Sequence, residues 1–375
     1  MQAGLRRNTV KDLLIMKRQQ KRTCSPDEQR GTKQPRFQWN LDAFGSPDGT
    51  RDVPPPPLHH LQNADPPCGS PGSSSGSQEN MSLFHWQVQQ AERRVKLLTA
   101  EQLSDQDEDG DTFLHIAVAQ GKRSLSYALA SRMSQTGSLD LKEHNGQTAL
   151  QIAAASDQNL IAGDLLRHGA RLGTRDQWGR TEFHVCAEKG HLATLQSIYR
   201  FLTENRQQAD VDMVNFEGLT PLHSAVLSHN AVLREHRTLK EPCQFMSRQL
   251  ENRRNRHRDC VRTLLLMGAN CGAQDLKSGR TVLHMAAEEG NLELLEVLLQ
   301  ASSAWAAVNS KTFSGNSPLH CCCSLSPPRP EVVTFLLRRG ADPGARNSEN
   351  EVPAQLVPEG PAGDPVRRML GGNQG

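Results

Sequence analysis

The sequence predicts an all-α repeat fold, in which pairs of helices stack side by side into a solenoid. A nine-residue pattern recurs in six copies that align without gaps: GDTFLHIAV, GQTALQIAA, GRTEFHVCA, GLTPLHSAV, GRTVLHMAA and GNSPLHCCC. The Thr or Ser positions of successive copies lie 36, 33, 39, 61 and 36 residues apart. Aromatic residues make up only 4% of the chain, which disfavours one large compact core and suits stacked repeats.

A period near 33 residues with the pattern T-P-L-H-x-A is typical of the ankyrin repeat. In that repeat Thr caps the first helix, Leu and Ala pack on the neighbouring repeat, and a Gly-Ala turn follows the second helix. The segments LLRHGA, LLLMGAN and LLRRGADP occur where such turns belong. We therefore predict an ankyrin-repeat solenoid of helix-turn-helix pairs with β-hairpin tips over residues 105–370, with six clear repeats and a degenerate seventh at NEVPAQLVP.

Three further segments surround or interrupt the repeats. Residues 24–80 are rich in Pro, Ser and Gly, which predicts a disordered linker because the segment has too little apolar surface to offset its chain entropy. Residues 81–104 predict an N-terminal capping helix. The 61-residue step hides an insertion of about 28 residues relative to the repeat period. That insertion, residues 231–258, carries eight Lys or Arg against three Glu.

The predicted capping helix begins at SLFHWQVQQ. Ser82 is the expected N-cap, because its hydroxyl can accept a hydrogen bond from a free N–H of the first turn. Helical spacing predicts that Leu83, Trp86, Val95 and Leu98 make the apolar contacts of this segment with the first repeat.

Composition excludes several classes of protein. The 43 Lys and Arg nearly balance 41 Asp and Glu, so the chain as a whole is no polycation for nucleic acid. No apolar run approaches the roughly 18 residues of a membrane span, and we expect no membrane partner. Nine cysteines without regular spacing or a secretory leader predict reduced thiols in the cytoplasm or nucleus.

The histidines and cysteines of the repeats are poorly placed to bind a metal ion. Successive helices lie roughly 8–10 Å apart, too far for one ion to join histidines of neighbouring repeats. We therefore expect these histidines to bond backbone in the adjoining turn: His115, His184, His223, His284 and His320. In HCCC the side chains of adjacent residues diverge, and Cys322 fills the small Ala position, so packing explains it better than zinc.

No catalytic motif for phosphate binding, acyl transfer, zinc hydrolysis or dinucleotide binding is present. We predict no catalytic residues, no metal and no cofactor. An acidic cluster precedes the first repeat, at Asp105, Asp107, Glu108, Asp109 and Asp111. An exposed turn before a helix N-terminus is the favoured interpretation, and a cation or partner site is the alternative.

An ankyrin array without catalysis binds proteins through its tips and inner helices. Trp178 and Phe216 belong to residue types that anchor interfaces, although each could instead pack on its own loop. The predicted partner-binding residues are His144, Asn145, Asp176, Gln177, Trp178, Asn215, Phe216, Glu217, Lys277, Ser278, Thr312 and Phe313.

Residues 82–370 resemble the atypical nuclear inhibitor-of-kappa-B family. The segments that carry the resemblance include SLFHWQVQQ, DEDGDTFLHIAVAQGKRSLSYALA, WGRTEFHVCAEKGH, KSGRTVLHMAAEEGNLEL and GADPGARNSENEVPAQLVPEGP. The resemblance implies that the repeats bind NF-kappa-B Rel-homology dimers, especially processed subunits that lack an activation domain. It also implies a nuclear coactivator or repressor at kappa-B promoters, which meets DNA mainly indirectly, through its partners. The alternatives are a cytoplasmic ankyrin scaffold and an inhibitor that sequesters NF-kappa-B away from DNA.

The first 23 residues form a separate basic amphipathic motif, NTVKDLLIMKRQQKRT. Its basic end is a candidate nuclear import signal, with Lys17, Arg18, Lys21 and Arg22. The motif also resembles the short peptide of the octamer-dependent B-cell coactivators, which clamps a POU domain on octamer DNA. That resemblance implies contacts with a POU-type factor through Val10, Lys11, Leu13 and Leu14. The two roles can coexist.

Overall fold

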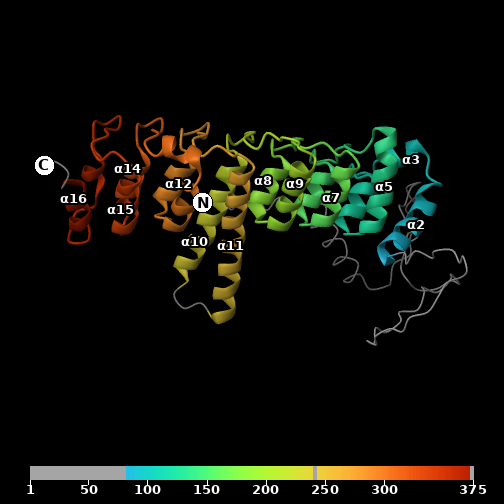
Figure 1. Cartoon of the computed structure of the whole chain (residues 1–375), viewed down its shortest axis with the longest axis horizontal. Helices are drawn as coiled ribbons and strands as arrows, with labels where there is room; N and C mark the ends of the chain where they lie inside the picture. Colours follow the sequence, from blue (N-terminus) through green and yellow to red (C-terminus); the bar gives the residue numbers. More distant parts are fainter. Residues whose placement is uncertain (1–81, 240–242, 372–375) are drawn as a thin grey trace, which may run out of the picture.

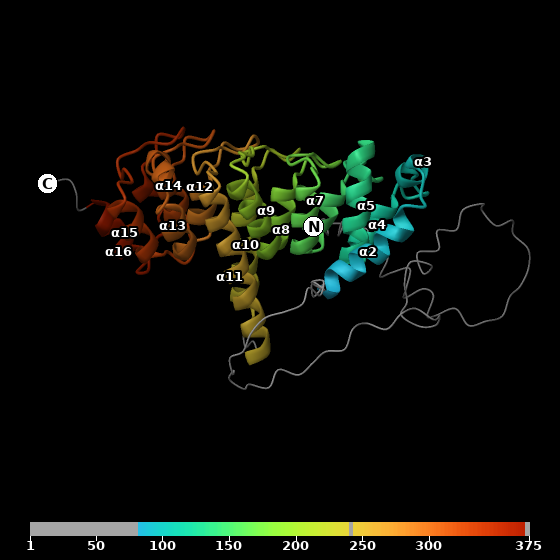
Figure 2. The same ribbon diagram turned by 45° about the vertical axis from the view of Figure 1, so that its right-hand side comes forward.

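The structure, a computed structural model, describes residues 82–239 and 243–371; the predicted N-terminal motif and the linker at residues 24–80 lie outside this range. Helix pairs follow one another in a single row, with their connecting tips along one edge (Figures 1 and 2). The predicted ankyrin solenoid is thereby confirmed. Its six pairs are α4 (Phe113–Ala119) with α5 (Arg123–Thr136), α6 (Ala149–Ala155) with α7 (Asn159–Arg167), α8 (Glu182–Lys189) with α9 (Leu192–Glu204), α10 (Pro221–Thr238) with α11 (Gln244–Leu266), α12 (Val282–Glu288) with α13 (Leu292–Leu298), and α14 (Pro318–Cys323) with α15 (Pro330–Arg338).

The Thr or Ser of each repeat begins the first helix as predicted. Thr112, for example, is the N-cap of α4, and its hydroxyl accepts a hydrogen bond from the N–H of His115. The Leu position of the pattern is buried in every repeat, at 0–1% exposure: Leu114, Leu150, Phe183, Leu222, Leu283 and Leu319. Each such side chain contributes about 1.5–3 kcal/mol by leaving water. One continuous apolar core therefore runs through the described repeats.

The tips differ from the prediction of β-hairpins, because no residue of the described ranges lies in a strand. Each tip is a tight turn closed by a few backbone hydrogen bonds. In the second tip the N–H of Glu143 donates to the carbonyl of Gln147 at 2.9 Å, and the N–H of Gly146 donates to Glu143 at 2.8 Å. Gly146 has a φ of 71°, a left-handed conformation that glycine adopts without strain. A turn this short leaves no room for a ladder of strand pairs.

The N-terminal cap consists of two helices, α2 (Leu83–Val95) and α3 (Ala100–Ser104), where one was predicted. Ser82 is the N-cap of α2, as expected, and accepts from the N–H of His85 at 3.3 Å. The predicted contacts of Leu83 and Trp86 are wrong: these side chains are 65% and 38% exposed.

The buried face of α2 consists of Val88, Ala91 and Val95. These residues are three and four positions apart, which places them on one side of a helix. Leu83 lies about 140° away from Val88 around the helix, at 100° per residue, and so points elsewhere. At the opposite end of the row, the degenerate seventh repeat forms η3 (Pro353–Leu356) and α16 (Asp364–Gly371), and Val366 and Leu370 of α16 are buried.

The insertion at residues 231–258 lengthens both helices of the fourth repeat. Helix α10 has 18 residues and α11 has 23, whereas the first helices of the other repeats have six to eight. The extra turns project from the row as a helical hairpin, on the side opposite the tips (Figure 1). We call this projection, residues 231–238 of α10 and 244–258 of α11, the helical hairpin.

Candidate functional site

Each tip is closed by a short polar side chain that accepts hydrogen bonds from its own turn. The Asp176 carboxylate accepts from the N–H groups of Trp178 at 2.9 Å and Arg180 at 2.8 Å. The Asn215 amide oxygen accepts from Glu217 at 2.9 Å and Leu219 at 3.0 Å. Asp176 and Asn215 are buried. Thr312 has the same role in its own tip, where its hydroxyl accepts from the N–H of Asn316 at 3.2 Å.

Backbone hydrogen bonds join successive tips into a row. The N–H of Gln177 donates to the carbonyl of Asn145 at 2.9 Å, and the N–H of Phe216 donates to Trp178 at 3.0 Å. Further along, Leu276 donates to Gly218 at 3.1 Å and Phe313 to Ser278 at 3.0 Å. Because each tip is bonded to the next, the side chains on this edge have fixed spacing.

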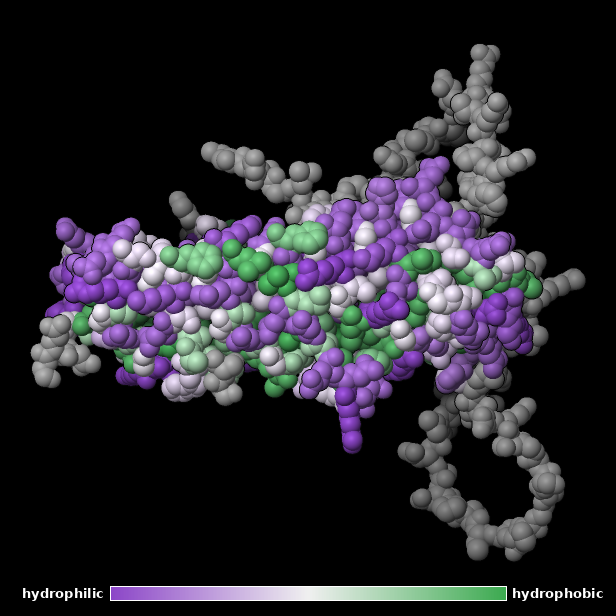
Figure 3. Space-filling view, turned by 90° about the horizontal axis from the view of Figure 1, so that it is seen from above, coloured by the Kyte–Doolittle hydropathy of each residue, from purple (hydrophilic) through white to green (hydrophobic). Residues whose placement is uncertain are grey.

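Four large apolar side chains follow one another along these tips: Trp178, Phe216, Leu276 and Phe313, which we call the apolar tip row. Phe216, Leu276 and Phe313 are 70%, 66% and 67% exposed. Trp178 is half-buried, and the guanidinium of Arg180 lies 4.6 Å from its ring centroid. Figure 3 shows this edge of the molecule from above, with hydrophobic residues in green among hydrophilic ones in purple.

The exposed rings of the apolar tip row also touch the preceding tip. A Cβ added to Gly179 would lie 2.7 Å from the ring of Phe216, and one added to Gly279 would lie 2.6 Å from the ring of Phe313. One edge of the Phe216 ring therefore packs on the preceding tip, whereas the alternative placed it on its own loop, and most of the ring faces solvent. Its role as an interface anchor stays a prediction. Contact with a glycine fixes the orientation of the ring, which lowers the entropy lost when a partner covers it.

Leu276 was missed by the sequence reasoning. It follows the turn-closing Asp275 as Phe216 follows Asn215, but its tip, DLKSG, has one residue more than NFEG. Alignment on the Gly therefore shifts Leu276 out of register, whereas alignment on the Asp or Asn would have found it.

The remaining predicted tip residues flank the apolar tip row. The side chains of Asn145 and Gln177 are joined by a 3.0 Å hydrogen bond across two tips. The hydroxyl of Ser278 lies 2.7 Å from the carboxylate of Asp275, and that of Thr312 lies 2.9 Å from Ser314. His144, Gln177, Glu217 and Lys277 are exposed.

The histidines of the repeats have a structural role. Nδ1 of His184 accepts from the backbone N–H of Thr181 at 3.1 Å, so its Nε2 carries the proton and donates to the carbonyl of Leu219 in the next repeat at 2.9 Å. Burial lowers the pKa of His184 to about 4, so the ring is neutral at pH 7. His115, His223, His284 and His320 make equivalent bonds to the next repeat, at 3.0, 3.2, 3.0 and 3.1 Å. The prediction that they bond backbone is confirmed.

The cysteines of HCCC pack in the core. Cys322 and Cys323 are 1% and 2% exposed, and burial raises the pKa of Cys323 to about 12. In the ranges 82–239 and 243–371, no three His, Cys, Asp or Glu side chains are grouped so that they could hold a metal ion. The acidic cluster forms a turn, in which the Asp107 carboxylate accepts from the N–H groups of Asp109 at 3.0 Å and Asp111 at 2.9 Å.

Stacked helix pairs, a fixed row of tips and structural histidines together define an ankyrin-repeat protein. The family described as ankyrin repeats (3 copies) matches residues 84–176 and 252–347. Over the described ranges, no helix combines the length and apolar character that crossing a membrane requires.

The chain is 47% identical to NF-kappa-B inhibitor zeta of Bos taurus over 306 residues, which cover 81% of this chain and 42% of that protein. It is 37% identical to NF-kappa-B inhibitor delta of Mus musculus over 300 residues, which cover 79% of this chain and 88% of the other. The crystal structure of the Bcl-3 ankyrin repeat domain aligns with a TM-score of 0.54 at 30% identity, covering 69% of this chain and all of that one.

The chain therefore belongs to the NF-kappa-B inhibitor family of ankyrin-repeat proteins, and among these relatives its identity is higher to zeta than to delta. It spans 42% of the length of the zeta relatives that it matches. Proteins of this family are interaction proteins without catalysis, and the chain is not an enzyme.

Proposed function

We propose that the chain binds NF-kappa-B Rel-homology dimers through its apolar tip row and acts in the nucleus as a coregulator of kappa-B-dependent transcription. The observation that carries the proposal is this row on a member of the family, in which half-buried Trp178 is followed at fixed spacing by exposed Phe216, Leu276 and Phe313. Large aromatic side chains dominate the free energy of many protein interfaces. The flanking His144, Asn145, Gln177, Glu217, Lys277, Ser278 and Thr312 would form its polar rim.

We prefer Rel dimers that remain on DNA to dimers that are removed from it. The full chain carries a near-neutral formal charge of +2, so it does not imitate the high negative charge of DNA phosphates. A partner whose DNA channel is basic is not displaced by electrostatic competition from such a surface. The preferred partners are processed subunits without an activation domain, since these gain most from a coregulator.

A gel shift tests the proposal directly. Purified chain is added to Rel homodimers on a labelled kappa-B duplex, with a duplex that lacks the kappa-B site as control. A slower ternary band is expected. Loss of the Rel–DNA band would contradict the coregulator role and indicate an inhibitor that sequesters the dimer. The absence of any effect would contradict Rel binding and favour the alternative of a cytoplasmic scaffold.

Location in cells separates the same alternatives. A tagged chain is expected in the nucleus, and changing Lys17, Arg18, Lys21 and Arg22 to Ala should reduce its nuclear fraction. Cytoplasmic residence of the intact chain, with and without an inflammatory stimulus, would contradict the nuclear role.

We further propose that the motif at residues 8–23 contacts a POU-type factor through Val10, Lys11, Leu13 and Leu14. The support is the amphipathic sequence itself, which is too short for a stable isolated helix and so would fold on a partner. Changing Leu13 and Leu14 to Ala should abolish co-precipitation of a POU domain while sparing Rel binding and nuclear entry. Loss of nuclear entry as well would indicate that the motif acts only as a nuclear import signal.

A further inference from the structure

The helical hairpin has one surface that anchors it to the row and another that faces solvent. On the anchoring side, Arg254 and Arg258 lie 3.3 and 2.7 Å from the carboxylate of Glu293, and Arg234 is paired with Glu289. His257 is buried beside Gly190, and its Nδ1 lies 3.2 Å from the carbonyl of Ala187. The hairpin is thus held rigidly by ion pairs and packing with the repeats on both sides.

The outer side of α11 has a different composition. Its exposed residues at positions i, i+3, i+4, i+7 and i+11 lie on one side of the helix: Phe245, Arg248, Gln249, Asn252 and Arg256, which we call the α11 outer face. Within the described ranges, no carboxylate lies within ion-pair distance of Arg248 or Arg256. The face therefore presents hydrogen-bond donors and positive charge without a counter-charge of its own.

We propose that the α11 outer face is a second binding surface, which contacts the phosphate backbone of double-stranded DNA. Arginine, asparagine and glutamine are the side chains that commonly donate to phosphate oxygens. Arg248 and Arg256 are eight residues apart, about 12 Å along a helix, which is close to the width of the DNA major groove. Each arginine can thus reach a phosphate on one side of the groove.

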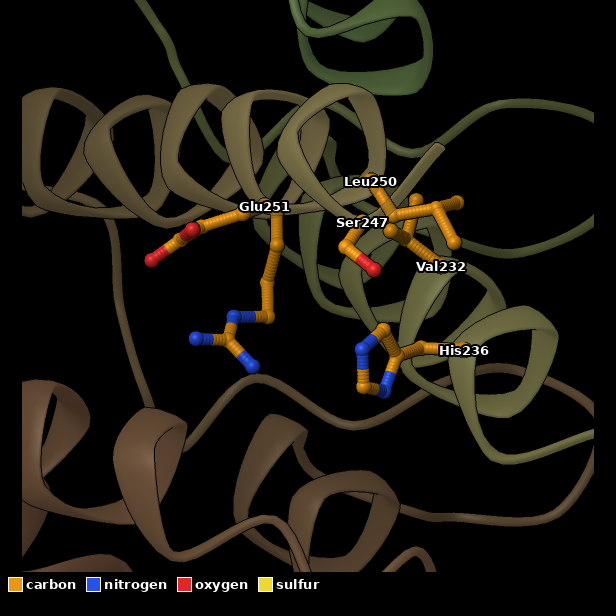
Figure 4. Close-up of a pocket in the computed structure, with 6 residues that line it drawn as sticks. Val232, His236, Ser247, Leu250 and Glu251 are labelled. Carbon is orange, nitrogen blue, oxygen red and sulfur yellow. The ribbon is translucent and has the colours of Figure 1, made fainter. Parts of the chain in front are cut away.

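An acidic protein segment fits this face less well. An amphipathic helix needs an apolar surface to bind, and this face offers one apolar side chain, Phe245, at 68% exposure. The apolar side chains between α10 and α11, Val232 and Leu250, are buried at 2% and 4% exposure. They line a cavity of about 270 Å³ elsewhere on the hairpin, together with His236, Ser247, Glu251 and Arg254. In Figure 4, Val232 of α10 lies beside Ser247 and Leu250 of α11, whereas Glu251 points away from them.

The hairpin projects from the side opposite the tips, so this surface is free when the apolar tip row is covered (Figure 1). The chain would then hold its partner with one edge and DNA with the other. This inference does not depend on Rel binding, because it concerns the chain alone.

Fluorescence anisotropy of a labelled duplex of about 30 base pairs, without a kappa-B site, tests the inference on the purified full chain at about 50–200 mM KCl. R248Q/R256Q should bind roughly tenfold more weakly, and the slope of log K against log salt should fall by about 1.8, because two phosphate contacts are lost. The matched control R93Q/R200Q removes two exposed arginines, of α2 and α9, and should change neither quantity.

Unchanged affinity and slope in R248Q/R256Q would overturn the proposal, as would an intact chain that does not bind the duplex. Binding of a labelled Glu-rich peptide that excess duplex cannot displace would also overturn it, in favour of an acidic protein. Both arginines are exposed and lie away from the tips, so thermal unfolding and calorimetric binding of a Rel homodimer without DNA should be unaffected by the double substitution. That result keeps failure here distinguishable from failure of the proposed function.

Discussion

The carboxyl group of Glu182 accepts a hydrogen bond from the backbone N–H of Gly173 at 2.8 Å, wholly inside the third repeat. Glu182 is 0% exposed and begins α8, at the position that Pro221 and Pro318 occupy in other repeats. Its second carboxyl oxygen has no hydrogen-bond partner among the described residues. Burial raises the pKa of Glu182 to about 7, so the group is close to half-protonated at neutral pH.

This carboxyl group should make stability depend on pH. The folded pKa of about 7 exceeds the ordinary 4.5, so the folded state binds the proton more tightly and stability falls as pH rises from 4.5 to 7. Glu182→Gln removes the charge, and at pH 8 it should raise the free energy of unfolding by at most about 3 kcal/mol. The gain should shrink toward pH 5. Thermal unfolding at several pH values measures this gain in stability, with the exposed Glu101→Gln as control. A gain independent of pH would show that the ionisation of Glu182 is not its cause.

The hydrogen bonds of His184 should be replaceable by those of a glutamine. Gln151 occupies the same position in the second repeat: its oxygen accepts from the N–H of Thr148 at 3.0 Å, and its amide donates to the carbonyls of Thr174 and Arg180 at 2.9 Å. His184→Ala should lower the free energy of unfolding by about 2–3 kcal/mol, because buried backbone groups lose their partners. His184→Gln should retain most of the stability that His184→Ala loses. Denaturant titration measures both, and equal losses in the two variants would refute the equivalence.

The apolar tip row should carry Rel affinity. Phe216→Ala and Phe313→Ala should each weaken binding of a Rel homodimer about tenfold or more, because each ring is a large exposed anchor. Leu160→Ala is the matched control, since Leu160 is 55% exposed on α7 and away from the tips. Calorimetric titration gives the affinities, and thermal unfolding shows whether each variant stays folded. A loss equal to that of the control would place the interface elsewhere.

The repeats could be predicted because capping, packing and turn residues recur at a fixed period. Even Gln151, which departs from the histidine of the pattern, makes the expected bonds to the next repeat. The helical hairpin could not be predicted from the sequence, because its outer face is polar and its apolar residues therefore show little helical periodicity. Leu276 was not predicted as a tip residue because its tip has one extra residue. The exposure of Trp86 was not predicted because the buried face of α2 is defined only by its packing on the repeats.

Thiol reactivity should separate the cysteines by burial. Cys243 is exposed at the N-terminus of α11, whereas Cys322 and Cys323 are buried in α14. Burial raises the pKa of Cys323 to about 12 and that of Cys322 further, so neither forms the reactive thiolate at pH 7.5. Maleimide should therefore modify Cys243 in the folded chain and reach Cys322 and Cys323 only in denaturant, as peptide-mapped mass spectrometry can show. Rapid modification of Cys322 without denaturant would mean that the last repeats open readily, because a thiol packed in the core is reached only when its helix separates from the row.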